Sequence, residues 1–127
     1  MSYEENYTTE TFFFDTYAIY EIYSGSENYK KYEDKVCITT KLNLYEIYLI
    51  ILRNGDQIGA EKTLSNYYQL ANDFDEETIK KAAEIKIKLN KRNVSMTDCI
   101  GYILAKRLGI KFLTGDREFK DLDNVES

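Results

Sequence analysis

Short apolar runs alternate with longer helical segments along most of this chain. Three of these runs have the β-branched or aromatic composition of buried strands: Thr11–Phe14, Val36–Thr39 and Ile110–Leu113. Strands that are apolar on both faces are typical of a parallel sheet with helices on each side. The pattern therefore predicts an α/β fold, a three-layer α/β/α arrangement with a central parallel sheet of four to five strands.

The segments between the apolar runs have the composition and spacing of helices. The predicted helices are Tyr17–Tyr23, Glu27–Lys35, Leu42–Arg53, Gly59–Leu70, Glu76–Arg92 and Ser95–Leu108. Glu76–Arg92 is expected to be the longest, and Gly109 is placed to end the last helix as a C-terminal cap. Two further short strands are expected at Asn72–Asp75 and Asn124–Glu126.

The chain is expected to form one domain. No repeat or proline-rich linker divides its 127 residues, so residues 11–127 are predicted to fold together after a flexible leader at residues 1–10. The leader lacks the apolar core of a signal peptide, and the apolar run Leu42–Leu52 is too short to span a bilayer. Cys37 and Cys99 lack metal-ligand spacing, which favours reduced thiols. These features predict a cytoplasmic protein with no membrane partner.

The sequence contains no histidine. This absence excludes Ser-His-Asp and Cys-His catalysis, histidine general bases and the usual zinc sites. The net charge of −5 argues against a nonspecific coat for nucleic acid, which needs a basic surface. It does not exclude a nucleic-acid enzyme, because carboxylates that bind divalent cations lower the net charge themselves. Any catalysis must use carboxylates, lysines, hydroxyls or a hard metal ion.

Two aspartates follow predicted strands. Asp15 comes directly after Phe12-Phe13-Phe14, and Asp116 follows the strand Ile110–Leu113 after Thr114-Gly115. Both therefore belong at the carboxyl edge of the sheet, where ligands bind in open parallel folds. Each also has a purely structural explanation, because Asp15 can cap the next helix and Asp116 can be a turn residue.

Two further acids lie in predicted helices. Glu46 is the only charge between Lys41 and Arg53, in a helix that is apolar on nearly every side and is therefore expected to be largely buried. A buried carboxylate needs a partner, a proton or a metal; the alternatives are a salt bridge or an exposed strip of the helix. Asp98 lies in the first turn of its helix, where the helix dipole favours an acid in any case.

Taken together, these four acids predict a metal site. Two lie at strand ends, one at a helix start and one in an apolar helix, as expected for oxygen ligands that meet in one crevice. Packed carboxylates repel one another, so some would have to take up protons without a cation. Hard cations suit such ligands, and Mg²⁺ or Mn²⁺ is the predicted cofactor.

The order of these motifs resembles a known family. It is Phe14-Asp15-Thr16, then Glu46 in an apolar helix, then Thr97-Asp98, then Phe112-Leu113-Thr114-Gly115-Asp116 with Phe119. This pattern, which extends from Thr11 to Glu126, resembles the PIN-domain nucleases and is most similar to the small VapC-type toxin ribonucleases. The most diagnostic parts are the stretch from Asp98 to Ala105 and the stretch from Asp116 to Phe119.

The resemblance implies roles for individual residues. The catalytic acids would be Asp15, Glu46, Asp98 and Asp116. Of these, Asp15, Asp98 and Asp116 would hold the metal, whereas Glu46 would bind metal or act as a base on the attacking water. Thr114 matches the family's hydroxyl residue near the metal, and Thr16 matches, more loosely, the small polar residue after the first aspartate.

Two features of the chain depart from the family pattern. The second residue after Asp15 is often small and polar in PIN domains, whereas Tyr17 stands here, a change that narrows the pocket or alters substrate access. The last strand is also expected to be short, because the chain ends soon after Asn124.

The resemblance further implies metal-dependent hydrolysis of RNA phosphodiester bonds. Arg117 and Lys120, which flank Asp116 in the sequence, are the residues best placed to meet RNA phosphates. A homodimer and, for a toxin, a cognate antitoxin protein are the implied partners. The alternatives are a nuclease of RNA processing or quality control and a catalytically inactive PIN-like binding module. A phosphotransfer receiver domain is a weaker alternative, because its paired early aspartates and its lysine position are not evident.

Overall fold

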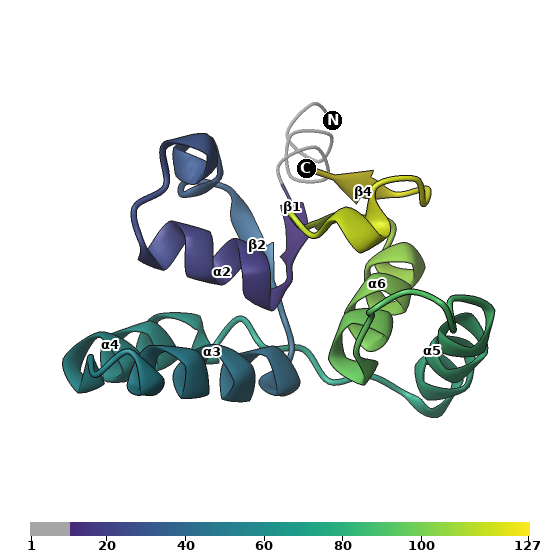
Figure 1. The fold of residues 1–127 in the computed structure, drawn as a ribbon, viewed down its shortest axis with the longest axis horizontal. Helices are drawn as coiled ribbons and strands as arrows, with labels where there is room; N and C mark the ends of the chain where they lie inside the picture. Colours follow the sequence, from purple (N-terminus) through teal and green to yellow (C-terminus); the bar gives the residue numbers. More distant parts are fainter. Residues whose placement is uncertain (1–10) are drawn as a thin grey trace, which may run out of the picture.

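The computed structural model describes residues 11–127 (Figure 1), so the predicted leader at residues 1–10 lies outside the described residues. The strands are β1 (Thr11–Phe14), β2 (Val36–Ile38), β3 (Lys111–Leu113) and β4 (Val125–Glu126). The α-helices are α2 (Thr16–Tyr23), α3 (Lys41–Arg53), α4 (Gln57–Tyr68), α5 (Glu76–Lys88) and α6 (Met96–Leu108). Two 3₁₀ helices are η1 (Glu27–Tyr32) and η2 (Arg117–Phe119).

The strands form one parallel sheet in the order β2-β1-β3-β4. Phe13 of β1 pairs with Ile38 of β2 on one side and with Phe112 of β3 on the other. The parallel four-strand sheet confirms the predicted fold class. A fifth strand at Asn72–Asp75 was the wrong expectation. The chain forms only an isolated bridge, between Thr39 and Ala71, just before this segment. A single residue pairs in this way, and the chain then continues without strand pairing to the start of α5.

Helices cover both faces of the sheet, as the apolar strands require. In Figure 1, α2, α3 and α4 lie on one side of the sheet and α5 and α6 on the other. Successive residues of β1 point to opposite faces of the sheet. Phe13 packs in the apolar cluster that contains α6 residues, and Phe14 packs in the cluster that contains α2 and α3 residues. Phe112 and Leu113 of β3 divide in the same way. The two-residue period of a strand thus explains why each run is apolar throughout.

The ends of α5 and α6 differ in how well the sequence predicted them. Gly109 ends α6 with φ of 73°, the left-handed conformation expected of a glycine cap. The helix α5 ends at Lys88 rather than at Arg92, and it is no longer than α3 or α6. The residues after Lys88 form turns, and the side chain of Arg92 is bound to the C-terminal segment instead of continuing the helix.

The helix α3 is less buried than its composition predicts. It buries Asn43, Leu44, Ile47 and Ile51 on one face. Its other face leaves Tyr45 69% exposed and Leu52 38% exposed. The reason is that α3 and α4 form the outermost layer on their side of the sheet, and no described element covers α3 from outside (Figure 1).

Two further predictions concern the cysteines and the membrane. Cys37 and Cys99 are both buried and unpaired, as predicted for reduced thiols. Within residues 11–127, no helix combines the length and the apolar character needed to cross a membrane.

Substitution of Gly101 tests the packing of α6 on the sheet. A Cβ atom at Gly101 would lie 2.7 Å from Cε1 of Phe13 and 3.2 Å from Cε1 of Phe112. Helix propensity alone predicts that Gly101→Ala stabilises the protein by ~1 kcal/mol. We expect the opposite, a loss of about 1–3 kcal/mol, because both rings are fully buried and cannot move aside. Urea unfolding of the two proteins measures the difference, and an increase in stability would contradict this account of the packing.

Candidate metal centre

Asp15 links β1 to α2 at the carboxyl edge of the sheet. Its backbone N–H donates to the Leu113 carbonyl of β3 at 3.3 Å, which continues the strand pairing by one residue. Its side chain caps α2, since Oδ1 accepts from the Ala18 backbone N–H at 2.8 Å. The residue is only 2% exposed. The capping role is therefore real, and it occupies one of the two carboxyl oxygens.

The surroundings of Asp15 favour its protonated form. The pKa of the carboxyl is raised from 3.8 to about 7, mainly by burial and in smaller part by the nearby charges of Asp98 and Asp116. Hydrogen bonds from the Thr114 hydroxyl and the Ala18 backbone lower this pKa and offset part of the effect. The carboxyl thus lies in an acidic setting that a cation would relieve.

Asp98 approaches the same region from the start of α6. It forms a capping box with Ser95, because Asp98 Oδ2 accepts from the Ser95 N–H and Ser95 Oγ accepts from the Asp98 N–H, both at 3.0 Å. Burial raises the pKa of Asp98, and Glu46 and Asp116 add to the rise through charge repulsion, whereas the hydrogen bonds with Ser95 lower it. Asp98 is thus coupled to acids that are 52 and 18 residues away in the sequence.

Asp116 begins η2 after strand β3. Its Oδ1 accepts from the Glu118 N–H at 3.0 Å, and its own N–H donates to Thr114 Oγ1 at 3.0 Å. The hydroxyl of Thr114 is therefore hydrogen-bonded to the backbone of one acid and to the side chain of another, Asp15. This shared hydroxyl fixes the two strand ends relative to each other.

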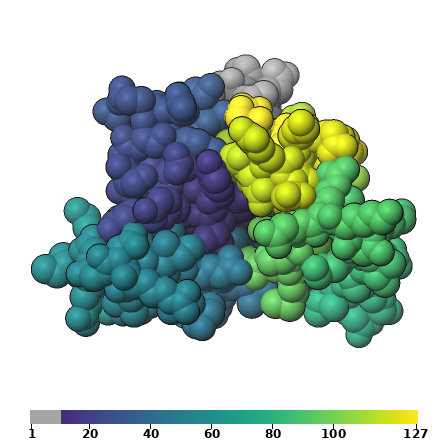
Figure 2. All heavy atoms as spheres, in the orientation of Figure 1, coloured from purple at the N-terminus to yellow at the C-terminus, as the bar shows by residue number. Residues whose placement is uncertain are grey.

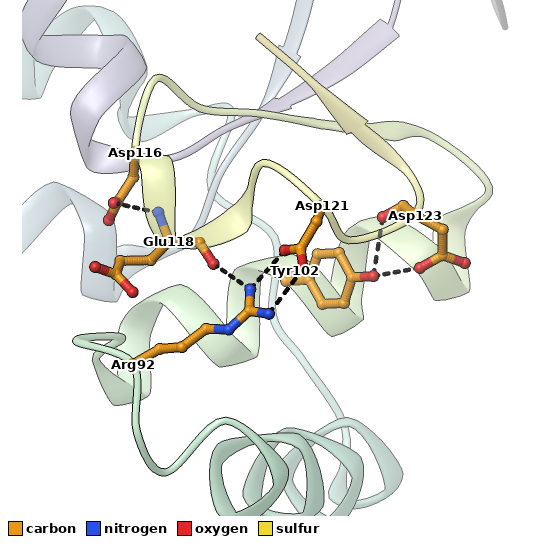
Figure 3. Close-up of polar contacts among 6 residues, drawn as sticks. All are labelled: Arg92, Tyr102, Asp116, Glu118, Asp121 and Asp123. Atoms are coloured by element: carbon orange, nitrogen blue, oxygen red, sulfur yellow. Dashed lines mark hydrogen bonds and ion pairs between the residues drawn. The ribbon is translucent and has the colours of Figure 1, made fainter.

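The segment that carries Asp116 is anchored on α6 and on the loop before it (Figure 3). Arg92 makes a two-pronged ion pair with Asp121, and its Nη1 also donates to the Glu118 carbonyl at 2.8 Å. Tyr102 donates its hydroxyl to the backbone carbonyl of Asp123 at 2.9 Å and to that residue's carboxylate. These contacts hold both ends of the chain that follows Asp116, and they limit how far Asp116 can move.

Glu46 is held by a chain of hydrogen bonds rather than by a cation. Its Oε1 accepts from the Thr16 hydroxyl at 2.7 Å. The Thr16 oxygen in turn accepts from Nδ2 of Asn43 at 3.1 Å, and Oδ1 of Asn43 accepts from the Thr40 hydroxyl at 2.6 Å. The chain ties α3 to the start of α2. It fixes the side chain of Thr16, a residue that the sequence predicted for the site, against the carboxylate of Glu46.

Asn43 is the residue of this site that sequence reasoning missed. It is 1% exposed, and its side chain is fully engaged by the two threonines. A signal was present, because Asn43 is a polar residue one helical turn before Glu46 on the same face of an apolar helix. A buried amide among apolar neighbours requires hydrogen-bond partners, and those partners lay at the site.

Charge repulsion links the four acids, because Asp98 and Asp116 raise the pKa of Asp15, and Glu46 and Asp116 raise that of Asp98. Within residues 11–127, no lysine or arginine forms an ion pair with Asp15, Glu46, Asp98 or Asp116. Three of them, Asp15, Asp98 and Asp116, each accept a backbone N–H at a helix start with one oxygen. The arrangement leaves carboxyl oxygens available to a hard divalent ion.

The ligand atoms available here are carboxylate oxygens, the type that hard divalent ions such as Mg²⁺ bind. In the part of the chain that the structure describes, no three His, Cys, Asp or Glu side chains come close enough to hold one ion together. Mg²⁺ does not need three, since it is usually bound through one or two carboxylates and keeps several water molecules. The carboxyl of Asp15 with its acidic neighbours Asp98 and Asp116 meets that requirement.

The two basic residues predicted to meet RNA lie on the surface near this centre. Arg117 is the first residue of η2, and Lys120 follows its last residue. Both side chains are exposed. Neither is drawn into the acidic cluster by an ion pair with another described residue.

The fold of this chain is similar to that of several solved structures. One is the toxin VapC20 of Mycobacterium tuberculosis, described as cleaving the sarcin–ricin loop, with 17% identity, coverage of 91% of this chain and 98% of that chain, and a TM-score of 0.77. A chain of a toxin–antitoxin complex from Klebsiella pneumoniae has 13% identity, 91% and 95% coverage and a TM-score of 0.69. A chain of VapBC2 from Rickettsia felis, bound to a promoter DNA fragment, has 14% identity, 91% and 95% coverage and a TM-score of 0.67.

At these identities the structural likeness establishes the fold alone. No curated protein matches the chain. The sequence profile of the PIN domain, by contrast, matches residues 12–125, which include the whole sheet except for its first and last residues and all four acids at its carboxyl edge. This match, on the fold just described, shows that the chain belongs to the PIN domain family.

Proposed function

We propose that this protein is a metal-dependent endoribonuclease that hydrolyses RNA phosphodiester bonds. The observation that carries the proposal is the group of four acids at the carboxyl edge of the sheet, with no lysine or arginine of residues 11–127 to neutralise them. Burial and mutual repulsion raise the pKa of Asp15 and of Asp98. Such perturbed carboxyls in one cluster are typical of functional sites.

The divalent ion, Mg²⁺ or Mn²⁺, would supply a bound water of lowered pKa and positive charge against the phosphate. Asp15, Asp98 and Asp116 would hold it, one or two of them directly and the rest through bound water molecules. The hydroxyl of Thr114 would keep Asp15 and the backbone of Asp116 in fixed relation. Glu46, oriented by Thr16, would accept a proton from the attacking water.

The family resemblance and the placement of charge support RNA as the substrate. The toxin VapC20, which this chain resembles in fold, is described as cleaving the sarcin–ricin loop. Arg117 and Lys120 lie exposed beside Asp116, where phosphate oxygens would need counter-charge. The phosphate would thus be held by basic side chains on one side and by the acid-bound ion on the other.

A toxin role with a cognate antitoxin is the biological setting we favour. Two of the similar structures are described as toxin–antitoxin or VapBC assemblies. An exposed apolar strip on α3, with Tyr45 and Leu52, offers surface for a protein partner. A homodimer and a cytoplasmic location remain predictions that accompany this proposal.

Substitution of Asp98 tests the proposed chemistry. Asp98→Asn removes a charge from the centre but keeps an oxygen that can accept from Ser95, so the capping of α6 is retained. We expect cleavage of a structured RNA in the presence of Mn²⁺ to fall by ~100-fold or more. Mutation of residues that only hydrogen-bond to metal ligands already lowers metal affinity or activity by about 10–100-fold. The melting temperature should change little.

The matched control is Asp75→Asn. Asp75 also caps a helix, α5, through Oδ1, but it lies away from the acidic centre and pairs with Arg107. Cleavage by this variant should equal that of the unchanged protein. Full cleavage by Asp98→Asn, or an equal loss in both variants, would remove the proposed role of Asp98.

The pKa of Asp15 gives a prediction about stability. Its folded pKa of about 7 lies above the value of 3.8 expected in the unfolded chain, so the folded protein holds a proton that the unfolded chain releases between these values. Without metal, this group makes stability fall as pH rises from about 4 to about 7, and the loss is complete above that range. Thermal unfolding in chelator at several pH values in this range measures how steeply stability falls with pH. Asp15→Asn should make this fall less steep.

Metal binding should reverse this trend. Protons and metal compete for the Asp15 carboxyl, so added Mn²⁺ should raise the melting temperature more at about pH 8 than at about pH 5. At an ion concentration of about 100 times its Kd, the gain in unfolding free energy is about 2.7 kcal/mol. An equal gain at both pH values, or the same gain in Asp15→Asn, would show that the metal does not bind at the Asp15 carboxyl.

A further inference from the structure

A cavity of about 400 Å³ opens beside the acidic centre, between α2, η1 and the C-terminal segment. In Figure 2 the surface of α2 (purple) meets that of the C-terminal segment (yellow) on the drawn face. The lining includes Tyr17, Glu21, Asn28, Tyr29, Lys31 and Gly115. Gly115 directly precedes Asp116, so a residue that lines the cavity is bonded to one of the proposed metal ligands.

The ring of Tyr17 lies against the backbone of Gly115. A Cβ atom at Gly115 would lie within 2.3 Å of Cε1 of Tyr17 and within 2.8 Å of the Tyr29 hydroxyl oxygen. Only a glycine at position 115 lets the two tyrosine side chains lie this close to the backbone. Tyr17 is also the residue that stands where PIN domains often have a small polar residue, and the structure shows that it forms a wall of this cavity.

Tyr17 is positioned to stack on a flat ring. It is 45% exposed, while Tyr29, which supports it at a centroid distance of 6.4 Å, is 8% exposed. Tyr29 packs in turn on Tyr32 at 5.8 Å. Burial raises the pKa of Tyr29, and the charges of Asp15 and Glu21 raise it further. The aromatic wall is therefore rigid at its base, open at Tyr17 and close to the acidic centre.

The polar lining has the chemistry to select one base. Among residues 11–127, the carboxylate of Glu21 has no hydrogen bond or ion pair, so both of its oxygens are free to accept. Guanine presents two neighbouring donors on its pairing edge, N1–H and the exocyclic amine, which match two carboxylate oxygens. Adenine presents an acceptor at N1, which a carboxylate would repel. Lys31, exposed at the rim, can meet a phosphate.

We propose that this cavity is the subsite for an unpaired guanine of the RNA substrate. The base stacks on Tyr17, and its pairing edge donates to Glu21. Single-stranded RNA is generally recognised in this way, through unstacked bases held on aromatic rings and bonded along their edges. The proposal deepens the proposed ribonuclease function and rests on it, because the subsite would place a nucleotide next to Asp116.

The test is binding of guanosine and adenosine monophosphates to the full chain, in chelator so that no cleavage or metal binding contributes. Nuclear magnetic resonance follows the Gly115 amide and the Tyr17 ring signals during each titration. We expect guanosine monophosphate to bind about tenfold more tightly than adenosine monophosphate. We expect Tyr17→Ala to weaken its binding about tenfold, the usual loss for a stacked base. Tyr17→Phe should retain stacking and bind normally.

Two further variants complete the design. Glu21→Gln should remove the preference for guanosine over adenosine monophosphate while leaving stacking intact. Tyr68→Ala is the matched control, because Tyr68 is 54% exposed at the end of α4 and does not line the cavity. It should bind both nucleotides as the unchanged protein does. Equal binding of the two nucleotides, or guanosine monophosphate binding that Tyr17→Ala leaves unaltered, overturns the subsite.

Failure of the subsite and failure of the nuclease function give different results. If RNA is cleaved but the nucleotides bind equally, the ribonuclease stands and the guanine subsite is wrong. If guanosine monophosphate binds with the expected dependence on Tyr17 and Glu21 while RNA is not cleaved, the cavity still takes guanine and the hydrolytic function is wrong.

Discussion

The burial of the Asp15 carboxyl among other acids is the constraint on which the rest of this site depends. A carboxyl that is 2% exposed loses most of its hydration, and Asp98 and Asp116 add repulsion to that loss. The structure offsets the cost locally with hydrogen bonds from Ala18 and Thr114, and it provides no lysine or arginine from the described residues. Such a group is tolerable as a protonated acid or as a ligand, and the parallel sheet is what keeps it there.

The sequence predicted the sheet and the positions of the acids because both depend on local patterns. An apolar run that ends in an acid, as at Phe14 and Asp15, marks the carboxyl end of a buried strand regardless of what surrounds it. The capping residues Ser95 and Gly109 mark the two ends of α6 in the same local way. Where the prediction concerned pairing across the sheet, as at Asn72–Asp75, local composition was insufficient and a strand was expected where only one bridge forms.

The features that the sequence did not reveal arise from contacts between distant residues. Asn43 belongs to the site only because Thr16, 27 residues earlier, accepts from its amide. Tyr17 was recognised as a departure from the family pattern, but its role needed the position of Gly115, 98 residues later in the chain. The exposure of Tyr45 likewise follows from the absence of a described outer layer over α3, which no pattern within that helix can indicate.

Structural and catalytic explanations of the acids are compatible, because a carboxylate has two oxygens. Asp15, Asp98 and Asp116 each use one oxygen to accept a backbone N–H at a helix start. Capping fixes the orientation of the side chain, and the second oxygen is then directed without further conformational cost. Glu46 lies within a helix and cannot cap it, so the Thr16 hydroxyl performs the same orienting task. The acids are therefore held in place by the protein alone, so the proposed metal ion would bind to side chains whose conformational entropy is already reduced.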